Sequence, residues 1–292
     1  MFGKKKKQIP SELTEYIEEE PTMKKKAKQL ADQIKQSKHI VIYTGAGAST
    51  SALIPDYRGP KGVWTLRELG RSNEIQYFDI EQALPTYCHY AITHLVKKDI
   101  VKYVVSTNLD GLHRRSGLDE DHLAELHGNS YREVCATCGK EYLRGFDVYK
   151  TVDDYRTHIT GRKCSCGGPL KDTIIHFSEN LPERDLKLSI DHSNKADLAI
   201  VMGTSMKVSP ACNLPLKAVN RGGKMCIVNL QKTSYDDQSF LRVYSKTDEF
   251  IKLVMEYLGE ADFDTSFDAL AHWQAYANTI HPLENLYRSP CK

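Results

Sequence analysis

The stretch HIVIYTGAGAST, residues 39–50, decides the fold, because an apolar run leads directly into two glycines that a single residue separates. A buried strand followed by Gly45-Ala46-Gly47 is typical of the first unit of a dinucleotide-binding domain, where glycine lets backbone N–H groups approach a pyrophosphate. The third glycine of that fingerprint is missing, and IPDYRGPKGVW follows where a regular helix would begin. Because two glycines also occur in tight turns that serve packing alone, the motif by itself leaves both interpretations open.

The run at 39–44 is the first of several short apolar or β-branched runs, and the others lie at 101–106, 172–177, 197–203 and 224–230. A helical pattern at 23–37 precedes the first run, and helical stretches that include 81–98 and 211–221 lie between most of the runs. Nearly continuous apolar strands that alternate with helices predict a parallel sheet covered on both faces. The sequence therefore predicts an α/β fold with a Rossmann-like, doubly wound parallel sheet.

The alternation of strands and helices breaks between residues 130 and 170, where a polar segment carries four of the eight cysteines. We therefore expect a small module inserted into a larger domain. The expected organisation is a disordered charged tail at 1–22, a Rossmann-like domain formed by 23–130 and 171–260, the module at 131–170, and a C-terminal extension at 261–292.

The clustered cysteines form two chelating pairs, Cys135-Ala-Thr-Cys138 and Cys164-Ser-Cys166. Four thiolates suit tetrahedral zinc, and a site with four protein ligands has no open position, so this zinc would be structural. The alternative is a set of scattered free thiols, since disulfides are rare in a reducing compartment. We interpret the four cysteines as ligands of one structural zinc ion, in a small zinc-binding module.

Composition narrows the class of partner. The chain has 292 residues and a net charge of +2, which is too small to predict nucleic-acid binding by the whole chain. No apolar run reaches the roughly 18–20 residues that cross a bilayer, and MFGKKKKQIPSEL lacks the hydrophobic core of a secretory signal. We expect a protein of the nucleus or cytoplasm without membrane contact, in which Lys4–Lys7 are an import signal, a weak chromatin or nucleic-acid contact, or a solvated tail.

Polar side chains follow another predicted strand and precede the cysteines: Asn108 and Asp110 in STNLDGLHRRSG, and His127 in ELHGNSY. Doubly wound sheets bind ligands at the carboxyl ends of their strands, so Asn108 and Asp110 could hold a polar fragment such as a carboxamide. The structural alternatives are a helix cap by Asp110 and a turn fixed by Asn108. His127 is a candidate general base, because its ordinary pKa lies near working pH and it stands at a domain junction.

Taken together, these stretches resemble the sirtuin family over roughly residues 23–260. The matching pieces occur in the family's order and are GAGAST, IPDYRGPKGVW, STNLDGLH, ELHGN, the cysteine pairs, HFSENLP, GTSMKVSP and IVNL. The runs IPDYRGPKGVWTL, TGRKC, KDTIIHF and IVNLQ are most similar to the class IV branch. The resemblance implies that the interrupted glycine fingerprint holds NAD as a consumed substrate rather than as a hydride carrier.

The resemblance also implies a role for each matching position. His127 would be the general base, and Asn108, also catalytic, would line the nicotinamide pocket with Asp110. NAD would be bound by Gly45, Ala46, Gly47, Thr50, Asp56, Tyr57, Arg58, Trp64, Thr107, Asn108, Asp110, Gly203, Thr204, Ser205, Asn229, Gln231 and Thr247. The substrate would lie extended between HFSENLP and KVSP, adding a strand by backbone hydrogen bonds. Its contacts would be Phe177, Ser178, Glu179 and Val208.

The implied reaction moves the acyl group of a modified protein lysine onto NAD, and it releases nicotinamide and 2′-O-acyl-ADP-ribose. Histones or other nuclear proteins are the expected substrates. Two positions depart from the family pattern: Thr107 stands where Gln is usual, and Ser178 stands where Gly is usual. These departures keep two alternatives open, a protein mono-ADP-ribosyltransferase and a catalytically weak NAD-binding chromatin module.

Overall fold

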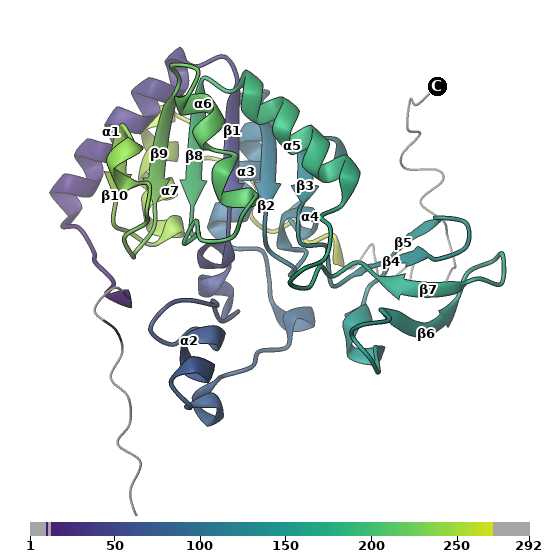
Figure 1. Ribbon diagram of the computed structural model, residues 1–292. Helices are drawn as coiled ribbons and strands as arrows, with labels where there is room; N and C mark the ends of the chain where they lie inside the picture. Colours follow the sequence, from purple (N-terminus) through teal and green to yellow (C-terminus); the bar gives the residue numbers. More distant parts are fainter. Residues whose placement is uncertain (1–9, 11–12, 271–292) are drawn as a thin grey trace, which may run out of the picture.

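The computed structural model describes residues 10 and 13–270, and its body is a six-stranded sheet between two layers of helices (Figure 1). The strands are β1 Ile40–Thr44, β2 Val101–Ser106, β3 Leu123–Glu125, β8 Leu198–Met202, β9 Lys224–Val228 and β10 Leu241–Val243. They lie in the order β10-β9-β8-β1-β2-β3, and every neighbouring pair is parallel. The strand order reverses between β1 and β8, which confirms the predicted doubly wound α/β fold.

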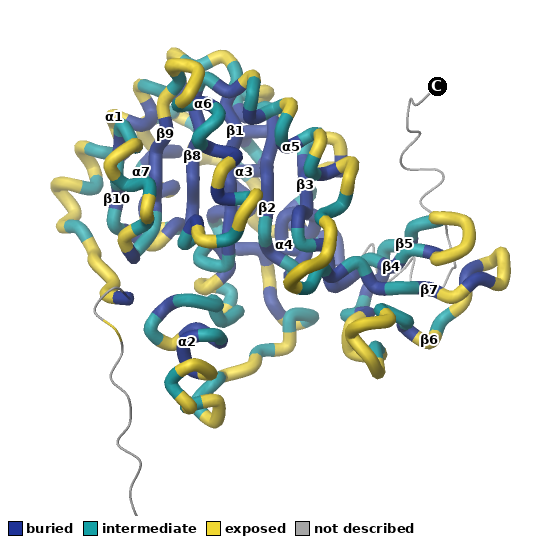
Figure 2. The backbone as a smooth tube through the Cα atoms, in the orientation of Figure 1, coloured by how far each residue is buried: buried dark blue, intermediate teal, exposed yellow. Residues whose placement is uncertain are grey.

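Helices cover both faces of this sheet. The helices of the described residues are α1 Glu20–Gln36, α2 Val63–Glu68, α3 Tyr87–Lys97, α4 Leu112–Arg115, α5 Glu183–Lys195, α6 Leu216–Val219 and α7 Thr247–Leu258, and those that pack on the sheet are α1, α3 and α7 on one face and α5 and α6 on the other. Ile40 and Ile42 of β1 pack into a core with α1, α3 and α7, whereas Val41 and Tyr43 pack into a second core on the α5 and α6 side. Figure 2 shows the strands as the most buried part of the molecule.

Most of the predicted elements are confirmed to within a few residues, and the differences have local causes. The apolar run 172–177 forms no strand after Asp172, because a single backbone bond from Ile175 N–H to the His127 carbonyl joins it to the body. The predicted helix 81–98 begins only at Tyr87, since Thr86 caps it after Pro85. The predicted helix 211–221 is broken into a 3-10 turn, η8 Ala211–Asn213, and the short α6.

The N-terminal segment differs from the disordered tail expected for 1–22. Helix α1 begins at Glu20 with Pro21 in its first turn, and residues 13–18 lie along the carboxyl edge of the sheet. The Tyr16 N–H donates to the Leu230 carbonyl at 2.9 Å, and the Glu18 N–H donates to the Tyr244 carbonyl at 2.9 Å. Backbone pairing with the ends of β9 and β10 therefore orders a stretch whose charged composition alone predicts disorder. The run Lys4–Lys7 lies outside the described residues.

The cysteine module is an antiparallel sheet in the order β5-β4-β7-β6, although no strand was predicted between residues 131 and 170. Its strands are β4 Arg132–Cys135, β5 Glu141–Leu143, β6 Ile159–Lys163 and β7 Pro169–Asp172. Several charged residues of this polar segment are paired within the sheet. The carboxylate of Glu133 is fully buried and accepts hydrogen bonds from Arg144 and Arg162.

Residues 261–270 of the expected C-terminal extension return to the body. The carboxylate of Asp268 forms an ion pair with Arg115 at 2.8 Å, and the Ala269 N–H donates to the Arg115 carbonyl at 2.9 Å. The remaining 3-10 turns are η2 Ala46–Ala48, η3 Thr50–Ala52, η4 Ser72–Glu74, η5 Ile80–Gln82, η6 Glu120–His122, η7 Val148–Thr151 and η9 Asp236–Gln238. Among the described residues, no helix combines the length and apolarity needed to cross a bilayer.

Candidate functional site

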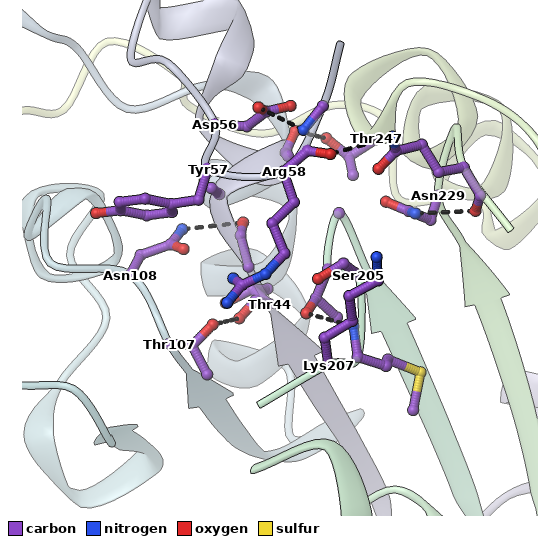
Figure 3. Close-up of a pocket in the computed structure, with 18 of the residues that line it drawn as sticks. Thr44, Asp56, Tyr57, Arg58, Thr107, Asn108, Ser205, Lys207, Asn229 and Thr247 are labelled. Atoms are coloured by element: carbon purple, nitrogen blue, oxygen red, sulfur yellow. Dashed lines mark hydrogen bonds between the residues drawn. The ribbon is translucent and has the colours of Figure 1, made fainter. Parts of the chain in front are cut away.

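A cavity of about 570 Å³ opens at the carboxyl edge of the six-stranded sheet, at the reversal of strand order (Figure 3). The segments that line it follow five of the strands and are 45–47 after β1, 107–108 after β2, 203–208 after β8, 229–231 after β9 and 245–247 after β10. The loop 56–59 and His127 also line it. This is the place where doubly wound folds bind their ligands.

The two glycines of GAGAST are required by the turn that follows β8. A Cβ atom on Gly47 would lie 2.7 Å from the Cα atom of Gly203, and a Cβ atom on Gly45 would lie 2.6 Å from the Cβ atom of Thr204. The Gly47 N–H also donates to the Gly203 carbonyl at 2.8 Å. The motif left open whether the glycines serve packing or ligand binding. The short distances show that they are needed for close packing, and the same turn places Ala46 on the cavity wall.

Asn108 and Asp110 have different positions. Asn108 lines the cavity, and its side-chain nitrogen donates to the Gly45 carbonyl at 3.1 Å and to the Ser49 hydroxyl at 3.2 Å. Asp110 is buried outside the cavity wall, where its carboxylate accepts from the Ser49 hydroxyl at 2.7 Å and from the Leu112 N–H at 2.9 Å. Asp110 thus accepts the first N–H of α4 from the position before the N-cap Gly111, a role close to the structural alternative stated above, and it supports Asn108 through Ser49.

His127 lies at the cavity wall with its tautomer set by the backbone. Its Nδ1 lies 3.2 Å from the Thr107 carbonyl oxygen, which can only accept, so Nδ1 carries the proton and Nε2 carries the lone pair. Burial lowers the pKa of His127; the Thr107 hydrogen bond opposes this shift and the Arg58 charge adds to it. The ring is therefore neutral at pH 7 and can accept a proton at Nε2.

Positive charge dominates the cavity wall. Among the described residues, the basic and acidic side chains on it are Arg58, Lys61, Lys207 and Lys246 against Glu15 and Asp56. Figure 3 shows Arg58 reaching into the cavity toward Thr44 and Thr107. Burial raises the pKa of Asp56, and the hydrogen bond from the Gly59 N–H opposes this rise. The wall suits an anionic group such as a pyrophosphate, and the N-terminus of α7 at Thr247 adds to this preference.

Most residues that were predicted to bind a cofactor gather on this wall. They are Gly45, Ala46, Gly47, Thr50, Asp56, Tyr57, Arg58, Thr107, Asn108, Gly203, Thr204, Ser205, Asn229, Gln231 and Thr247. The amide nitrogen of Gln231 donates to the backbone carbonyls of Leu13 and Arg58, so it ties the N-terminal segment to the 56–59 loop. Trp64, like Asp110, does not line the cavity.

The predicted substrate contacts divide in the same way. Val208 lines the cavity, whereas Phe177, Ser178 and Glu179 lie outside it. The rings of Tyr57 and Trp64 lie 6.2 Å apart, and those of Trp64 and Phe177 lie 6.0 Å apart. These three aromatic side chains form a row from the cavity wall to Phe177, which is 71% exposed.

The four clustered cysteines converge on one point. Their sulfur atoms all lie within 4.8 Å of one another, and the distances from Cys138 to Cys164 and Cys166 are 3.6 and 3.5 Å. A zinc ion with four bonds of about 2.3 Å in tetrahedral geometry requires sulfur atoms about 3.8 Å apart. The donor set of Cys135, Cys138, Cys164 and Cys166 therefore fits the predicted structural zinc ion.

Sequence reasoning missed several residues of the wall. Lys207 lies in GTSMKVSP and Lys61 in IPDYRGPKGVW, so both were within quoted motifs without being named. Lys246 directly precedes Thr247, which was named. No sequence pattern indicated that Glu15 would reach the cavity, because its segment has the charged composition of a disordered tail.

Comparison with family models and known proteins supplies the context for this geometry. Residues 70–210 match the model described as the Sir2 family. The chain is 43% identical over 249 residues to the NAD-dependent protein deacetylase SRT1 of Arabidopsis thaliana, covering 84% of this chain and 52% of SRT1. It is 40% identical over 269 residues to the NAD-dependent protein deacetylase sirtuin-7 of Homo sapiens, covering 89% of this chain and 65% of that protein. The chain thus spans between half and two thirds of these curated relatives.

A shorter relative is matched along almost its whole length. The chain is 35% identical over 246 residues to an NAD-dependent protein deacetylase of Thermotoga maritima, covering 79% of this chain and 98% of the relative. A solved structure described as Sir2 with a p53 peptide and NAD+ superposes with a TM-score of 0.64 at 34% identity, covering 80% of this chain and 99% of that one. A Sir2 variant with deacetylated p53 peptide and 3′-O-acetyl-ADP-ribose superposes with a TM-score of 0.65 at 34% identity, covering 79% of this chain and 98% of the variant.

Proposed function

Because the chain belongs to the Sir2 family, we propose that it is an NAD-dependent protein-lysine deacylase that releases nicotinamide and 2′-O-acyl-ADP-ribose. One observation carries the proposal. A cationic cavity at the reversal of strand order is bordered by a histidine whose Nε2 is held as a proton acceptor. An anion-binding wall beside a neutral base is what the binding of a dinucleotide and the deprotonation of its ribose require.

The wall residues would have three roles in cofactor binding. Gly45, Ala46, Gly47 and Thr50, with Gly203, Thr204 and Ser205, would present backbone and hydroxyl groups to the pyrophosphate. Arg58 and Lys207 would supply positive charge, and Asn229, Gln231 and Thr247 would face the adenosine half. No described residue donates a hydrogen bond to the side-chain oxygen of Asn108, which leaves that oxygen for a ligand donor such as the nicotinamide amide. Asp110 and Trp64 would act from behind this wall, through Ser49 and Tyr57.

When bound, NAD supplies the ribose carbon that the acyl oxygen attacks as nicotinamide leaves. His127 would then accept the proton of a ribose hydroxyl at Nε2, while the Thr107 carbonyl stabilises the imidazolium that forms through its bond to Nδ1. Asn108 is held by Gly45 and Ser49, so its position at the cavity wall is fixed before the ligand binds.

The acyl-lysine segment would enter between Val208 on the cavity wall and the exposed segment Phe177-Ser178-Glu179. Sir2 structures with acetylated and propionylated peptides support this substrate class. We assign residues 23–130 and 171–260 to the cofactor-binding domain and 131–170 to the zinc module. Histone targets, a nuclear location and a weak chromatin contact through Lys4–Lys7 complete the proposal; they rest on the sequence resemblance and on the lysine run.

A second candidate rests on Thr107. Its hydroxyl donates to the Thr44 carbonyl at 3.2 Å, and its side chain is shorter than the Gln usual at this position. A threonine held in this way contacts a ribose poorly, which favours a catalytically weak NAD-binding module. The protein mono-ADP-ribosyltransferase alternative uses the same wall with a different acceptor.

Mass spectrometry tests the proposal. The purified chain is incubated with NAD and matched acetyl-lysine and long-chain acyl-lysine histone peptides, and O-acyl-ADP-ribose is followed. We expect the product with wild type and with a His122→Tyr control, but not with His127→Tyr. The side chain of His122 is 42% exposed, pairs with Asp119 and does not line the cavity. Binding of NAD without product contradicts the proposal, and transfer of labelled ADP-ribose to protein identifies the transferase.

A further inference from the structure

We propose that His158 of the zinc module is a positioning residue for the substrate-binding segment, because it joins Asp172 at the end of β7 to Glu179 beside Phe177. This proposal rests on the proposed function and extends it. We call the three side chains of His158, Asp172 and Glu179 the histidine clamp. It links the module that zinc stabilises to the segment that would contact the acyl-lysine peptide.

The geometry uses both nitrogens of one imidazole ring. Nδ1 of His158 lies 3.1 Å from Oδ1 of Asp172, and Nε2 lies 2.9 Å from Oε1 of Glu179. The second oxygen of Glu179 accepts from the His176 N–H at 2.7 Å. Glu179 therefore closes the turn 176–179 on itself and fastens it to the module at the same time.

The turn 176–179 needs stabilising contacts from outside the turn. Ser178 in its middle has a φ of 76°, in the left-handed region that favours glycine. Phe177 next to it is 71% exposed, so packing does little to order this part of the chain. A charged tie through Glu179 supplies the order that side-chain burial does not.

Both carboxylates accept only, so a ring that bonds to both must carry two protons and a positive charge. Burial by itself would lower the pKa of His158, but the hydrogen bonds to Glu179 and Asp172 outweigh it and raise the pKa above the ordinary 6.5. Burial would raise the pKa of Glu179, but the bonds from His158 and the His176 N–H lower it below 4.5. The clamp therefore forms between the lowered pKa of Glu179 and the raised pKa of His158, and it opens as the pH rises through the latter.

Other titratable groups around the clamp do not replace this cation. The His176 ring lies 5.3 Å from the His158 ring and between Tyr149 and Tyr155. Asp172 has no exposed side-chain surface and also accepts from the Ile174 N–H at 2.8 Å. The described ion pairs give Asp172 no cationic partner other than His158.

The clamp predicts a specific pattern of kinetic effects. Loss of the charge on His158 releases the turn 176–179 on the peptide side and leaves the cavity wall unchanged. The KM for the acyl-lysine peptide therefore rises with pH and in clamp variants, while the KM for NAD stays the same. A charged hydrogen bond of this kind contributes enough to change peptide affinity about tenfold.

The test compares wild type, His158→Gln, Glu179→Gln, the double variant and His158→Arg, with His122→Gln as the matched control. Hydrogen exchange of the amides at 176–179 is measured at pH 6 and pH 9, corrected for intrinsic rates. Binding of a fluorescent acetyl-lysine peptide is measured by anisotropy, and the KM values for peptide and NAD are measured separately. Zinc content and melting temperature report on folding.

At pH 6, His158→Gln and Glu179→Gln each raise the His176 amide exchange rate and the peptide Kd about tenfold. The double variant is no worse than either single one, and His158→Arg retains tight binding up to pH 9. Unchanged exchange, or faster exchange with unchanged peptide affinity, overturns the proposal. If wild type binds the peptide without turnover, the proposed function fails. The clamp is then tested by the peptide Kd and the amide exchange rates of the variants. If wild type does not bind the peptide at all, both are overturned.

Discussion

Replacing Gly203 by alanine tests why this cavity is built on glycines. Gly203 has a φ of 64°, and a Cβ atom on it would lie 2.5 Å from the Ala48 nitrogen and 2.6 Å from the Gly47 carbonyl carbon. The left-handed backbone costs an alanine about 1–2 kcal/mol. Because the clashing atoms belong to the backbone of the turn after β1, relieving the contact costs about 1–3 kcal/mol more. We therefore expect Gly203→Ala to lose about 2–5 kcal/mol of unfolding free energy in total.

A matched control separates the two costs. Gly70 has a φ of 69° and nothing within 4 Å of its ideal Cβ position, so Gly70→Ala carries only the backbone cost of about 1–2 kcal/mol. In urea unfolding, the difference between the two variants measures the close approach of the two strand-end turns. Calorimetric titration with NAD should show affinity at least about tenfold lower for Gly203→Ala and unchanged for Gly70→Ala. Equal stability and equal NAD affinity for the two variants would refute this account of the glycines.

Three further predictions concern zinc, the base and the C-terminal segment. Cys138→Ser should lose zinc and melt at lower temperature, because structural zinc contributes folding free energy; full metal content with unchanged melting contradicts this. His127→Tyr should abolish turnover without unfolding. Since burial lowers the pKa of His127 below its ordinary 6.5, the fall of wild-type kcat/KM on acidification should have its midpoint below pH 6.5, and a midpoint above pH 6.5 argues against this base. Asp268→Asn should lose about 2–4 kcal/mol of unfolding free energy, since the Arg115 side chain is 1% exposed and pairs with no other carboxylate of the described residues; a loss no larger than that of the exposed Asp264→Asn in urea unfolding counts against the ion pair.

The parts of the fold that sequence predicts are those in which one physical signal dominates. The strand 40–44 is buried along its whole length, so its apolar run was readable without knowledge of its neighbours. The strands 123–125 and 241–243 are three residues long and are defined by their pairing with a neighbour, which a local pattern does not show. The helix 183–195 was missed because its buried side chains include Asp185, Ser189 and Ser193 rather than an apolar stripe.

The helix 247–258 was also missed, although its apolar residues show the spacing of a helix. Phe250, Ile251, Val254 and Met255 have helical spacing and are buried against α1 and α3.

The candidate site also contains residues that a local pattern predicts and residues that it does not. Side chains next to strand ends were predictable, because parallel strands bring their carboxyl ends to one edge of the sheet. Glu15 reaches the same cavity from a segment ordered by long-range backbone bonds, which no local pattern reveals.

The incomplete fingerprint at 45–50 follows from how the turn is used. In a regular dinucleotide fold the chain enters a long helix after the glycines, and the third glycine lets that helix pack against the strand. Here two short 3-10 turns follow, and the loop 53–62 passes Arg58 into the cavity, so no helix requires the third glycine. Gln231 and a few backbone bonds hold this loop, and these can break without disturbing the sheet. A cofactor that is cleaved at each turnover needs an exit for two different products, and a loop tied in this way can open for both.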